Sequence, residues 1–321
     1  MKYLIRILAA MLLSLGAGSS FAQNFPVRPV HMFIGFPAGT STDILARMLA
    51  QKLGDTWGQN VVADNRAGAG SSIAAAAVAK STPDGYTLLF NSSAQSINPA
   101  LYAKLPYDTL KDFVEIAAVA SQPNVLVVNP SSSIKSVAEL IAEAKAKPGQ
   151  LNFGSAGVGT GTHLNLEKFK LMAGVDITHI PYKGTPEVVT DIIGGRTTGY
   201  FAPITAALPF VQSGKLRALA VSGGKRSAQL PNVPTIAEAG VKGFEFLLWF
   251  GVWGPAGMPA DLVNRIAGDI NRVLATADMK EQFAKASTET LVMTTAEFAQ
   301  FVRKEIDDNG RVIKAAGIQP Q

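Results

Sequence analysis

The sequence contains no cysteine, few charged residues and only three histidines. The absence of cysteine excludes a cysteine nucleophile, a zinc site with thiolate ligands, an iron–sulfur cluster and a redox-active cysteine pair. Charged residues make up 17% of the 321 residues and hydrophobic residues 47%, which predicts a packed core. The formal net charge of +5 is too small to indicate nucleic-acid binding. The histidines, His31, His163 and His179, do not stand at the spacing of a metal-ligand pair, so no metal and no cofactor is expected.

Apolar runs long enough to cross a bilayer are also missing, because a spanning helix needs about 20 residues. The run over residues 7–15 is shorter. It follows Lys2 and Arg6 and leads into small residues up to Ala22, which is the pattern of a secretory signal peptide. We therefore expect residues 1–22 to be a signal peptide that is cleaved after Ala22, and the mature chain to be exported. The lack of cysteine excludes a bacterial lipoprotein anchor.

The rest of the chain alternates short apolar runs with segments of helical spacing. The strand-like runs cover residues 30–34, 86–90, 124–128, 151–153, 176–181, 198–201 and 216–222. Residues 259–317 have a helical pattern only. This alternation predicts an α/β fold with mostly parallel sheets flanked by helices. Because no linker divides the chain, we expect two interleaved domains with a ligand cleft between them: residues 23–122 plus 247–321, and residues 123–246.

The loop over residues 36–43 is the first candidate binding segment. It follows a strand-like run, and Thr40 or Ser41 can cap the helix that comes after it. The free amides of the first helical turn, together with the helix dipole, suit a carboxylate or a phosphate. Asp43 allows two interpretations, because a carboxylate in the first turn also stabilises the helix dipole. We favour that structural role over direct contact with a ligand.

A glycine-rich loop over residues 154–164 is the second candidate. It is no P-loop, because Thr160-Gly161 stand where a lysine and a hydroxyl residue are needed, and its glycines do not follow the dinucleotide pattern G-x-G-x-x-G. What remains is a turn that enters a helix and brings backbone N–H groups and the hydroxyls of Ser155, Thr160 and Thr162 close to an anion. A purely structural turn is the alternative interpretation.

Two further segments also allow alternative interpretations. Lys183 follows a strand and could offer a cation to a carboxylate, although a solvated surface lysine is the usual case. Trp249 lies in the apolar run over residues 244–253, which predicts either core or the wall of a cleft. Little points to an enzyme, since the sequence has no G-x-S-x-G elbow and its carboxylates lie on helical faces that solvation explains.

Several short motifs follow one another along nearly the whole mature chain. They are Gly35-Phe36-Pro37-Ala38-Gly39, Asn65-Arg66-Ala67-Gly68-Ala69-Gly70, Pro83-Asp84-Gly85-Tyr86-Thr87-Leu88-Leu89, Gly154-Ser155-Ala156-Gly157 with His163-Leu164, Pro181-Tyr182-Lys183-Gly184, Pro231-Asn232-Val233-Pro234-Thr235-Ile236-Ala237-Glu238-Ala239-Gly240 and Trp249-Phe250-Gly251. Together they resemble the Bug proteins, the TctC-like substrate-binding proteins of the tripartite tricarboxylate transporters. The chain departs from the family pattern at Thr40-Ser41, where members often carry further glycine, and at Ala67 and Ser71, where Pro and Gly are common.

The resemblance implies a periplasmic Venus-flytrap receptor, type II-like, whose two α/β lobes close around a small carboxylate. The receptor would deliver its ligand to a membrane permease with subunits of the TctA/TctB type. One carboxylate group would lie between the two loops, and the rest of the ligand would face a variable wall. The ligand-binding residues implied in this way are Phe36, Ala38, Gly39, Thr40, Ser41, Asp43, Ser92, Ser93, Ser155, Gly157, Gly159, Thr160, His163, Tyr182, Lys183, Ala202, Pro203 and Trp249.

The identity of the carboxylate stays open at this point. A dicarboxylate, an aromatic carboxylate and an acidic amino acid all offer the group that the two loops would bind. We expect a monomer without catalytic residues and without a nucleic-acid partner. Two alternatives to transport remain: a ligand sensor for a membrane signalling kinase and, as the more distant alternative, a periplasmic enzyme.

Overall fold

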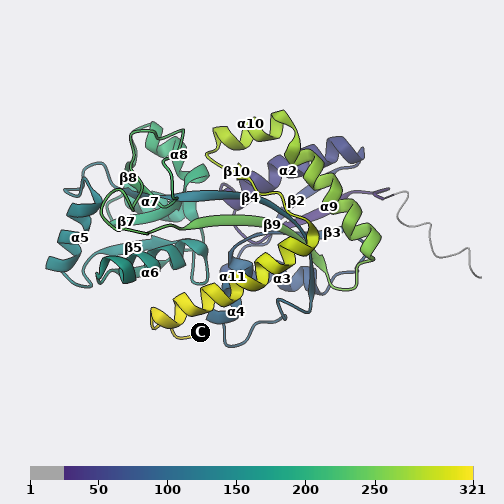
Figure 1. The fold of residues 1–321 in the computed structure, drawn as a ribbon, viewed down its shortest axis with the longest axis horizontal. Coiled ribbons are helices and arrows are strands. Elements are labelled where there is room, and N and C mark those ends of the chain that lie inside the picture. Colours follow the sequence, from purple (N-terminus) through teal and green to yellow (C-terminus); the bar gives the residue numbers. More distant parts are fainter. Residues whose placement is uncertain (1–24, 321) are drawn as a thin grey trace, which may run out of the picture.

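The computed structural model describes residues 25–320, and the expected signal peptide lies outside the described residues. Strands β4 (Phe113–Val128) and β9 (Leu247–Pro255) run side by side along the long axis of the molecule and join two groups of elements, which we call the first and second lobes (Figure 1). The first lobe contains β1 (Val30–Ile34), α2 (Ser41–Trp57), β2 (Val61–Asn65), η1 (Ala69–Ser71), α3 (Ser72–Ala79), β3 (Thr87–Ser92), α4 (Ala94–Leu101), α9 (Ala260–Ala275), α10 (Ala277–Lys285), β10 (Glu289–Thr290) and α11 (Thr295–Ala315). The second lobe contains α5 (Val137–Ala146), β5 (Asn152–Ser155), α6 (Gly161–Ala173), β6 (Thr178–Pro181), α7 (Thr185–Ile193), β7 (Gly199–Pro203), α8 (Ile204–Gln212) and β8 (Arg217–Val221).

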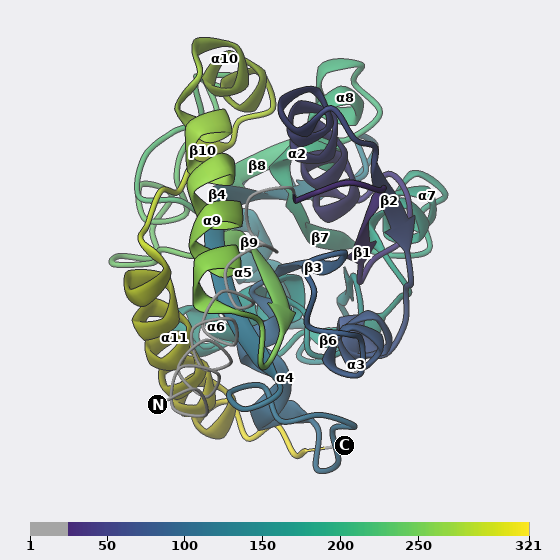
Figure 2. The ribbon, with the colours of Figure 1, turned by 90° about the vertical axis from the view of Figure 1, so that its right-hand side faces the viewer.

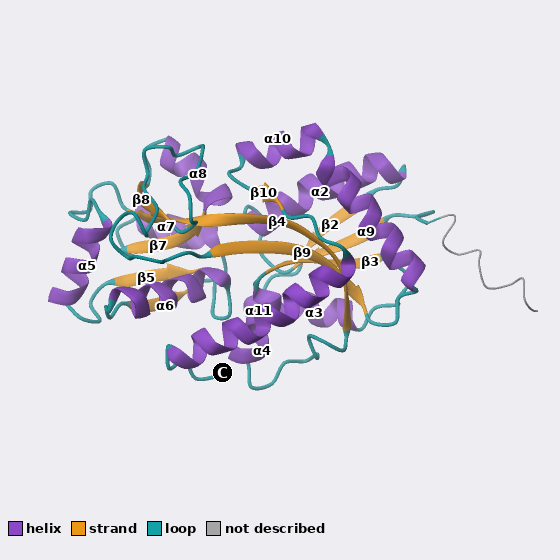
Figure 3. Ribbon diagram, viewed as in Figure 1, coloured by secondary structure: helices purple, strands orange, loops and turns teal. Residues whose placement is uncertain are grey.

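The strands pair in a mixed arrangement, whereas the sequence predicted mostly parallel sheets. They follow one another in the order β2-β1-β3-β9-β4-β7-β5-β6, and β8 and β10 also pair with β4. Pairing is parallel between β1 and its neighbours and between β5 and its neighbours. It is antiparallel wherever β4 or β9 takes part. The chain passes to the second lobe along β4 and returns along β9, so these two strands run in opposite directions. The predicted α/β class is confirmed, and helices flank the strands (Figure 3).

Some strands stand where the sequence predicted none. β2 contains polar residues such as Asp64 and Asn65 and lies at the edge of the strand order, where its residues are half-buried and show no alternation. The first part of β4, residues 113–123, also went unpredicted, and the two-residue β10 interrupts the segment that had a helical pattern only. Strands of this kind depend on their partners, which local pattern does not reveal.

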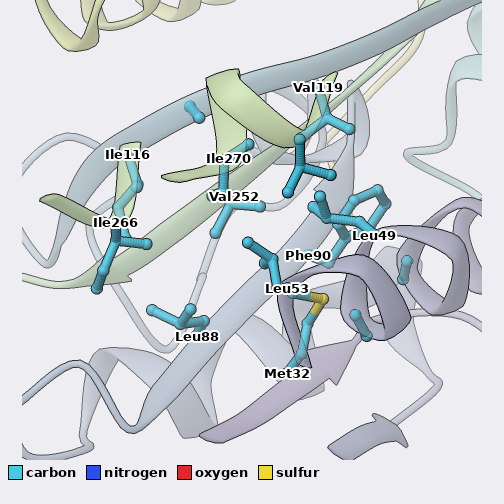
Figure 4. Close-up of a cluster of buried hydrophobic side chains, with 14 of the residues drawn as sticks. Met32, Leu49, Leu53, Leu88, Phe90, Ile116, Val119, Val252, Ile266 and Ile270 are labelled. Carbon is cyan, nitrogen blue, oxygen red and sulfur yellow. The ribbon is translucent and has the colours of Figure 1, made fainter. Parts of the chain in front are cut away.

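Buried side chains of the first lobe alternate between two faces of its sheet. Leu88 and Phe90 of β3 pack in a cluster with α2 and α9, whereas Leu89 between them packs with α3 and α11. This is the two-residue period of a strand covered on both faces. Figure 4 shows part of the first cluster, in which Leu49 and Leu53 of α2 lie near Met32 of β1. Figure 2 shows the helices arranged around these strands.

β4 contributes core residues to both lobes. Val119 belongs to the first-lobe cluster, Leu126 packs with α5 and α6, and Val127 packs with α7 and α8 on the opposite face. The predicted domain boundary between residues 122 and 123 therefore falls inside one continuous strand, and the division into domains at that position stays a prediction. Within residues 25–320, no helix combines the length and the apolar composition that crossing a membrane requires.

Candidate functional site

Three helices begin beside one cavity between the lobes. Ser41, Gly161 and Thr185 are the first residues of α2, α6 and α7, and all three line the cavity. α2 follows β1 in the first lobe, and α6 and α7 follow β5 and β6 in the second, so the cavity lies at the carboxyl ends of parallel strands. First-turn amides have no acceptor within their own helix and carry the positive end of its dipole. The convergence of these helix starts therefore suits an anion.

The cavity is small and its lining is electrically neutral. Its volume is about 30 Å³. The polar lining consists of hydroxyl residues only: Thr40, Ser41, Thr42, Ser92, Thr160, Thr162 and Thr185. The other lining residues are Phe36, Ala156, Gly161, Pro203, Leu248 and Phe250. The Ser41 hydroxyl is buried and has no hydrogen-bond partner in residues 25–320, so it is available to a bound group. Residues 25–320 contain no cluster of side chains that could hold a metal ion.

The first loop is shaped by Asp43, whose carboxylate is turned toward the loop. One Asp43 oxygen accepts from the Gly39 N–H at 3.0 Å, and the other accepts from Arg47 Nε and from Asn65 Nδ2, each at 2.8 Å. Asn65 Nδ2 also donates to the Phe36 carbonyl at 2.9 Å. Asp43 does not line the cavity. These contacts support the structural role that the sequence favoured for this residue, with loop bracing added to the effect on the helix dipole.

The second loop uses hydroxyl groups to hold its own backbone. Ser155 Oγ accepts from the Gly157 N–H at 3.1 Å, and Thr162 Oγ1 accepts from the Ala156 N–H at 3.0 Å. Thr160 Oγ1 donates to the Gly157 carbonyl at 2.7 Å. The loop amides at positions 156 and 157 are therefore already engaged. In the first turn of α6 the His163 N–H is also engaged, because it donates to Thr160 Oγ1 at 3.4 Å, so the amides of Gly161 and Thr162 remain for a ligand.

Two glycines of the second lobe lie against the first lobe. A Cβ atom added at Gly184, in the second lobe, would lie 3.0 Å from Pro37 Cγ in the first. One added at Gly159 would lie 2.6 Å from Asn98 Oδ1 of α4. The Tyr102 hydroxyl, also at the end of α4, donates to the Val158 carbonyl at 3.3 Å. Glycine at these two positions lets the lobes approach closely enough for the cavity to be enclosed from both sides.

The structure gathers some of the expected ligand-binding residues and separates others. The residues that line the cavity are Phe36, Thr40, Ser41, Ser92, Thr160 and Pro203. The residues that do not line it are Ala38, Gly39, Asp43, Ser93, Ser155, Gly157, Gly159, His163, Tyr182, Lys183, Ala202 and Trp249. Trp249 is buried in the first-lobe core, where its Nε1 donates to Glu305 at 2.8 Å. The Tyr182 hydroxyl bonds to Asp191 at 2.8 Å and to Thr197 at 2.7 Å, within the second lobe.

Sequence reasoning missed several lining residues, of which Thr185 and Leu248 are the clearest. Thr185 begins α7 after Gly184, and Pro186 in the first turn was a readable sign of a helix start there. The Thr185 hydroxyl lies 3.0 Å from the hydroxyl of Tyr200, whose pKa is raised by burial, so the phenol stays protonated behind the cavity. Leu248 belongs to β9, and no local signal connects it to loops far away in the sequence.

A pair of histidines, of which His163 is buried and His179 is half-buried, lies behind the second loop. The rings of His163 and His179 stack with centroids 4.0 Å apart and planes 16° from parallel. His179 Nε2 lies 2.6 Å from Ser155 Oγ, the atom that holds the Gly157 amide. Burial, with a smaller effect from the charge of Lys170, lowers the pKa of His163 to about 4. Burial, with smaller effects from His163 and Lys170, lowers the pKa of His179 to about 3. Both rings are therefore neutral at neutral pH.

These histidines should make the free energy of unfolding decrease as the pH falls. Their folded-state pKa values lie below the ordinary value of 6.5, so the unfolded chain takes up protons first as the pH falls. Stability is complete above about pH 6.5 and decreases toward pH 4, by about 1.4 kcal/mol per pH unit for each histidine. We expect urea denaturation to show a smaller acid loss for His179→Phe than for the wild type. Equal losses of stability between pH 7 and pH 4 would show that the fold does not hold the His179 ring neutral.

Known proteins similar to this chain include a family of transport receptors and a solved complex with a carboxylate. The family model described as "Tripartite tricarboxylate transporter family receptor", TctC, matches residues 45–318. The chain is 39% identical to Protein BugT of Bordetella pertussis over an alignment of 298 residues. This alignment covers 92% of this chain and 91% of BugT. It is similar to the structure of R. palustris Rpa4515 with adipate, with a TM-score of 0.90, 35% identity and coverage of 92% of this chain and 100% of that one.

A second solved structure extends the similarity. MatC from Rhodopseudomonas palustris with bound malate has a TM-score of 0.85 and 28% identity, covering 90% of this chain and 100% of that one. These matches confirm the resemblance inferred from the motifs and the α/β fold of periplasmic binding proteins. They also confirm that the chain is a solute-binding protein and not an enzyme. The chain belongs to the TctC family of tripartite tricarboxylate transporter receptors.

Proposed function

We propose that this receptor binds a small carboxylate in the cavity between the loops over residues 36–43 and 154–163, and delivers it to permease subunits of the TctA/TctB type. The observation that carries the proposal is the convergence of the first turns of α2, α6 and α7 on one neutral cavity. The complexes of Rpa4515 with adipate and of MatC with malate support a carboxylate as the ligand.

The carboxylate oxygens would accept hydrogen bonds from the first-turn amides and from the Ser41 hydroxyl. The hydroxyls of Thr40 and Thr160 have another task, since they donate to the Pro37 carbonyl at 2.8 Å and to the Gly157 carbonyl at 2.7 Å. These threonines therefore fix the loops around the ligand. Binding without arginine or lysine leaves no buried cation behind when the ligand departs, which suits a receptor that must release its cargo.

Binding couples to lobe closure because the donors come from both sides. α2 contributes from the first lobe, and α6 and α7 contribute from the second. A ligand shifts an equilibrium between two states only through its different affinity for them. A carboxylate that contacts both loops when the lobes meet, and only one when they separate, has that difference and favours the closed state.

The proposal includes the domain boundaries, the location and the oligomeric state expected from the sequence. Residues 23–122 plus 247–321 would form one domain and residues 123–246 the other, with β4 and β9 as the connections that bend. The signal peptide would be cleaved after Ala22, and the mature receptor would act in the periplasm as a monomer.

A thermal-shift screen of carboxylates tests the proposal. A ligand at 100 times its Kd stabilises the native state by about 2.7 kcal/mol, which raises the midpoint of a chain of this size by about 4 °C. We expect at least one acid among adipate, malate, citrate, benzoate and glutamate to do so, while adipamide, the neutral diamide matched to adipate, does not. The proposal fails if no carboxylate in the screen shifts the midpoint, or if the diamide shifts it as much as the acid.

A further inference from the structure

A second cavity lies behind the strands that connect the lobes, and we call it the back cavity. Its volume is about 920 Å³. It is lined by Leu247 of β9, by residues of the segment 223–231 in the second lobe and by residues of the segment 284–289 in the first. Leu247 is next to Leu248, which lines the ligand cavity, and neighbouring side chains of a strand point to opposite faces. The back cavity therefore lies on the face of the connecting strands that is turned away from the ligand cavity.

One hydrogen bond joins the two lobes across the back cavity. Ser227, in the loop after β8, has its Oγ 2.9 Å from the Oγ of Ser287, which lies between α10 and β10. Phe283 of α10 packs in the first-lobe cluster, and Leu230 packs in a second-lobe cluster with α7 and α8. Each serine is therefore anchored to its own lobe. Figure 1 shows the two helices next to these segments, α8 and α10, on the same side of β4.

The serine pair is stronger than the ion pair beside it. Lys225 Nζ lies 2.6 Å from Glu289 Oε1, again between the lobes, but the side chains are 79% and 66% exposed. Exposed ion pairs contribute little, because water and salt screen them. Ser227 is buried and Ser287 half-buried. A hydrogen bond in such surroundings changes an equilibrium by about two- to tenfold.

Ser287 has a backbone conformation that favours glycine. Its φ is +54°, in the left-handed region. Strain of this kind at a residue with a side chain persists only where the surroundings support it, and it is concentrated at functional positions. Glycine would make the same turn without strain. What serine adds is a hydroxyl, and the partner of that hydroxyl in the described part of the chain is Ser227 of the other lobe.

Buried bonds tie the same first-lobe segment to the connecting strand. The Thr205 hydroxyl, near the start of α8, lies 2.9 Å from the Ala286 carbonyl oxygen and 2.9 Å from Thr288 Oγ1, and it also bonds to Gln122 Oε1. Gln122 belongs to β4, so these bonds lie at the strand on which the lobes would turn, where a rotation shifts atoms least. The serine pair lies in loops outside the sheet and would separate first.

We propose that the bond between Ser227 and Ser287 is a positioning contact for ligand binding, formed when the lobes close and lost when they separate. The proposal rests on the proposed function and adds residues behind the connecting strands to those that set the affinity. Hydroxyl groups no longer bond beyond about 3.5 Å, so a relative shift of about 1 Å breaks the pair. Losing it lowers the closed fraction, and the apparent affinity falls by the same factor.

Ser287→Gly tests the contact by calorimetry with the acid, among adipate, malate, citrate, benzoate and glutamate, that raises the midpoint most. The variant removes the hydroxyl and relieves the left-handed strain, so its stability in urea should equal or exceed that of the wild type. Its affinity should nevertheless fall about three- to tenfold. A structural role alone would not lower the affinity of a protein that is equally stable.

Ser213→Gly is the matched control. It also exchanges a serine for glycine, but the Ser213 hydroxyl donates to the Phe210 carbonyl at 3.3 Å, within the second lobe. Its affinity should stay within twofold of the wild type. Ser227→Ala removes the other partner and should lower the affinity as Ser287→Gly does. The double variant should lose no more than the larger single loss, because both changes remove one bond.

The outcomes separate this proposal from the proposed function. If the wild type binds none of the five acids, the proposed function is wrong. If the wild type binds one of them and Ser287→Gly binds it equally well, the serine pair does not position the lobes. Single losses that add up in the double variant, or an equal loss in Ser213→Gly, would overturn the proposal as well.

Discussion

Replacing Gly161 with valine is expected to lower the affinity for the carboxylate ligand by about 100-fold or more. A Cβ atom at Gly161, the first residue of α6, would lie 2.1 Å from Leu248 Cδ2 and 2.8 Å from Ser93 Oγ. Both neighbours are buried, and they belong to β9 and to the start of α4. Overpacking of this kind costs about 1–3 kcal/mol, and a branched side chain also obstructs the cavity between the lobes.

The control for this prediction is Gly268→Val in α9. Gly268 is also helical, but a Cβ atom there meets nothing within 4 Å. Both variants exchange a helical glycine for the same valine, which has the better helix propensity, and only Gly161→Val places atoms between the lobes. Isothermal calorimetry should therefore find wild-type affinity in Gly268→Val. Similar affinities in the two variants would show that Gly161 does not lie where the lobes meet around the ligand.

Gly159→Asp is expected to lower the affinity by a similar factor, for a different reason. Gly159 has φ +80, which is unfavourable for a residue with a side chain, and its Cβ would lie 2.6 Å from Asn98 Oδ1 and 3.1 Å from Tyr102 Cε2. The new carboxylate would face the carbonyl oxygen of Asn98 from the opposite lobe. Closure would therefore require the loop to move, and the first turn of α6 would leave its position beside the cavity between the lobes.

Gly195→Asp is the matched control for the backbone contribution. Gly195 has φ +72, close to the value at Gly159, and nothing lies within 4 Å of an added Cβ. Both variants should lose about 1–2 kcal/mol of stability from the left-handed conformation. Only Gly159→Asp should lose affinity in calorimetry. Binding by Gly159→Asp at the wild-type level, with its stability reduced, would show that closure does not depend on the contact with Asn98.

The two binding loops could be predicted from sequence because their signals are local. Thr40 and Thr160 each precede a helical segment, and each side chain accepts from the backbone N–H three residues on, at 3.3 Å and 3.4 Å. A capping hydroxyl depends on residues within one turn, so the sequence is enough to place it. The role of Asp43 was also readable in part, since its position in the first turn is local, whereas its bond to Asn65 was not.

The rest of the site depends on contacts between distant segments. The stack of His163 on His179 joins a helix to a strand, and sequence separation alone does not reveal it. Leu248 reaches the cavity between the lobes because β9 returns beside β4, with Gln122 opposite Leu248 in the register. Such pairing is decided by burial and hydrogen bonding across the whole sheet. Local patterns therefore placed the apolar run near Trp249 without saying which of its side chains would face the cavity.

The sequence by itself determined the absence of thiol chemistry, the α/β class, the helix starts that bear the binding loops and the family to which the chain belongs. These properties follow from composition, from periodicity and from motifs a few residues long. The tertiary structure alone decided the mixed pairing of the strands, the enclosure of the cavity by neutral hydroxyls from both lobes, and the position of Lys183 outside that cavity. Those features require segments more than a hundred residues apart to meet, because each lobe supplies only half of the site.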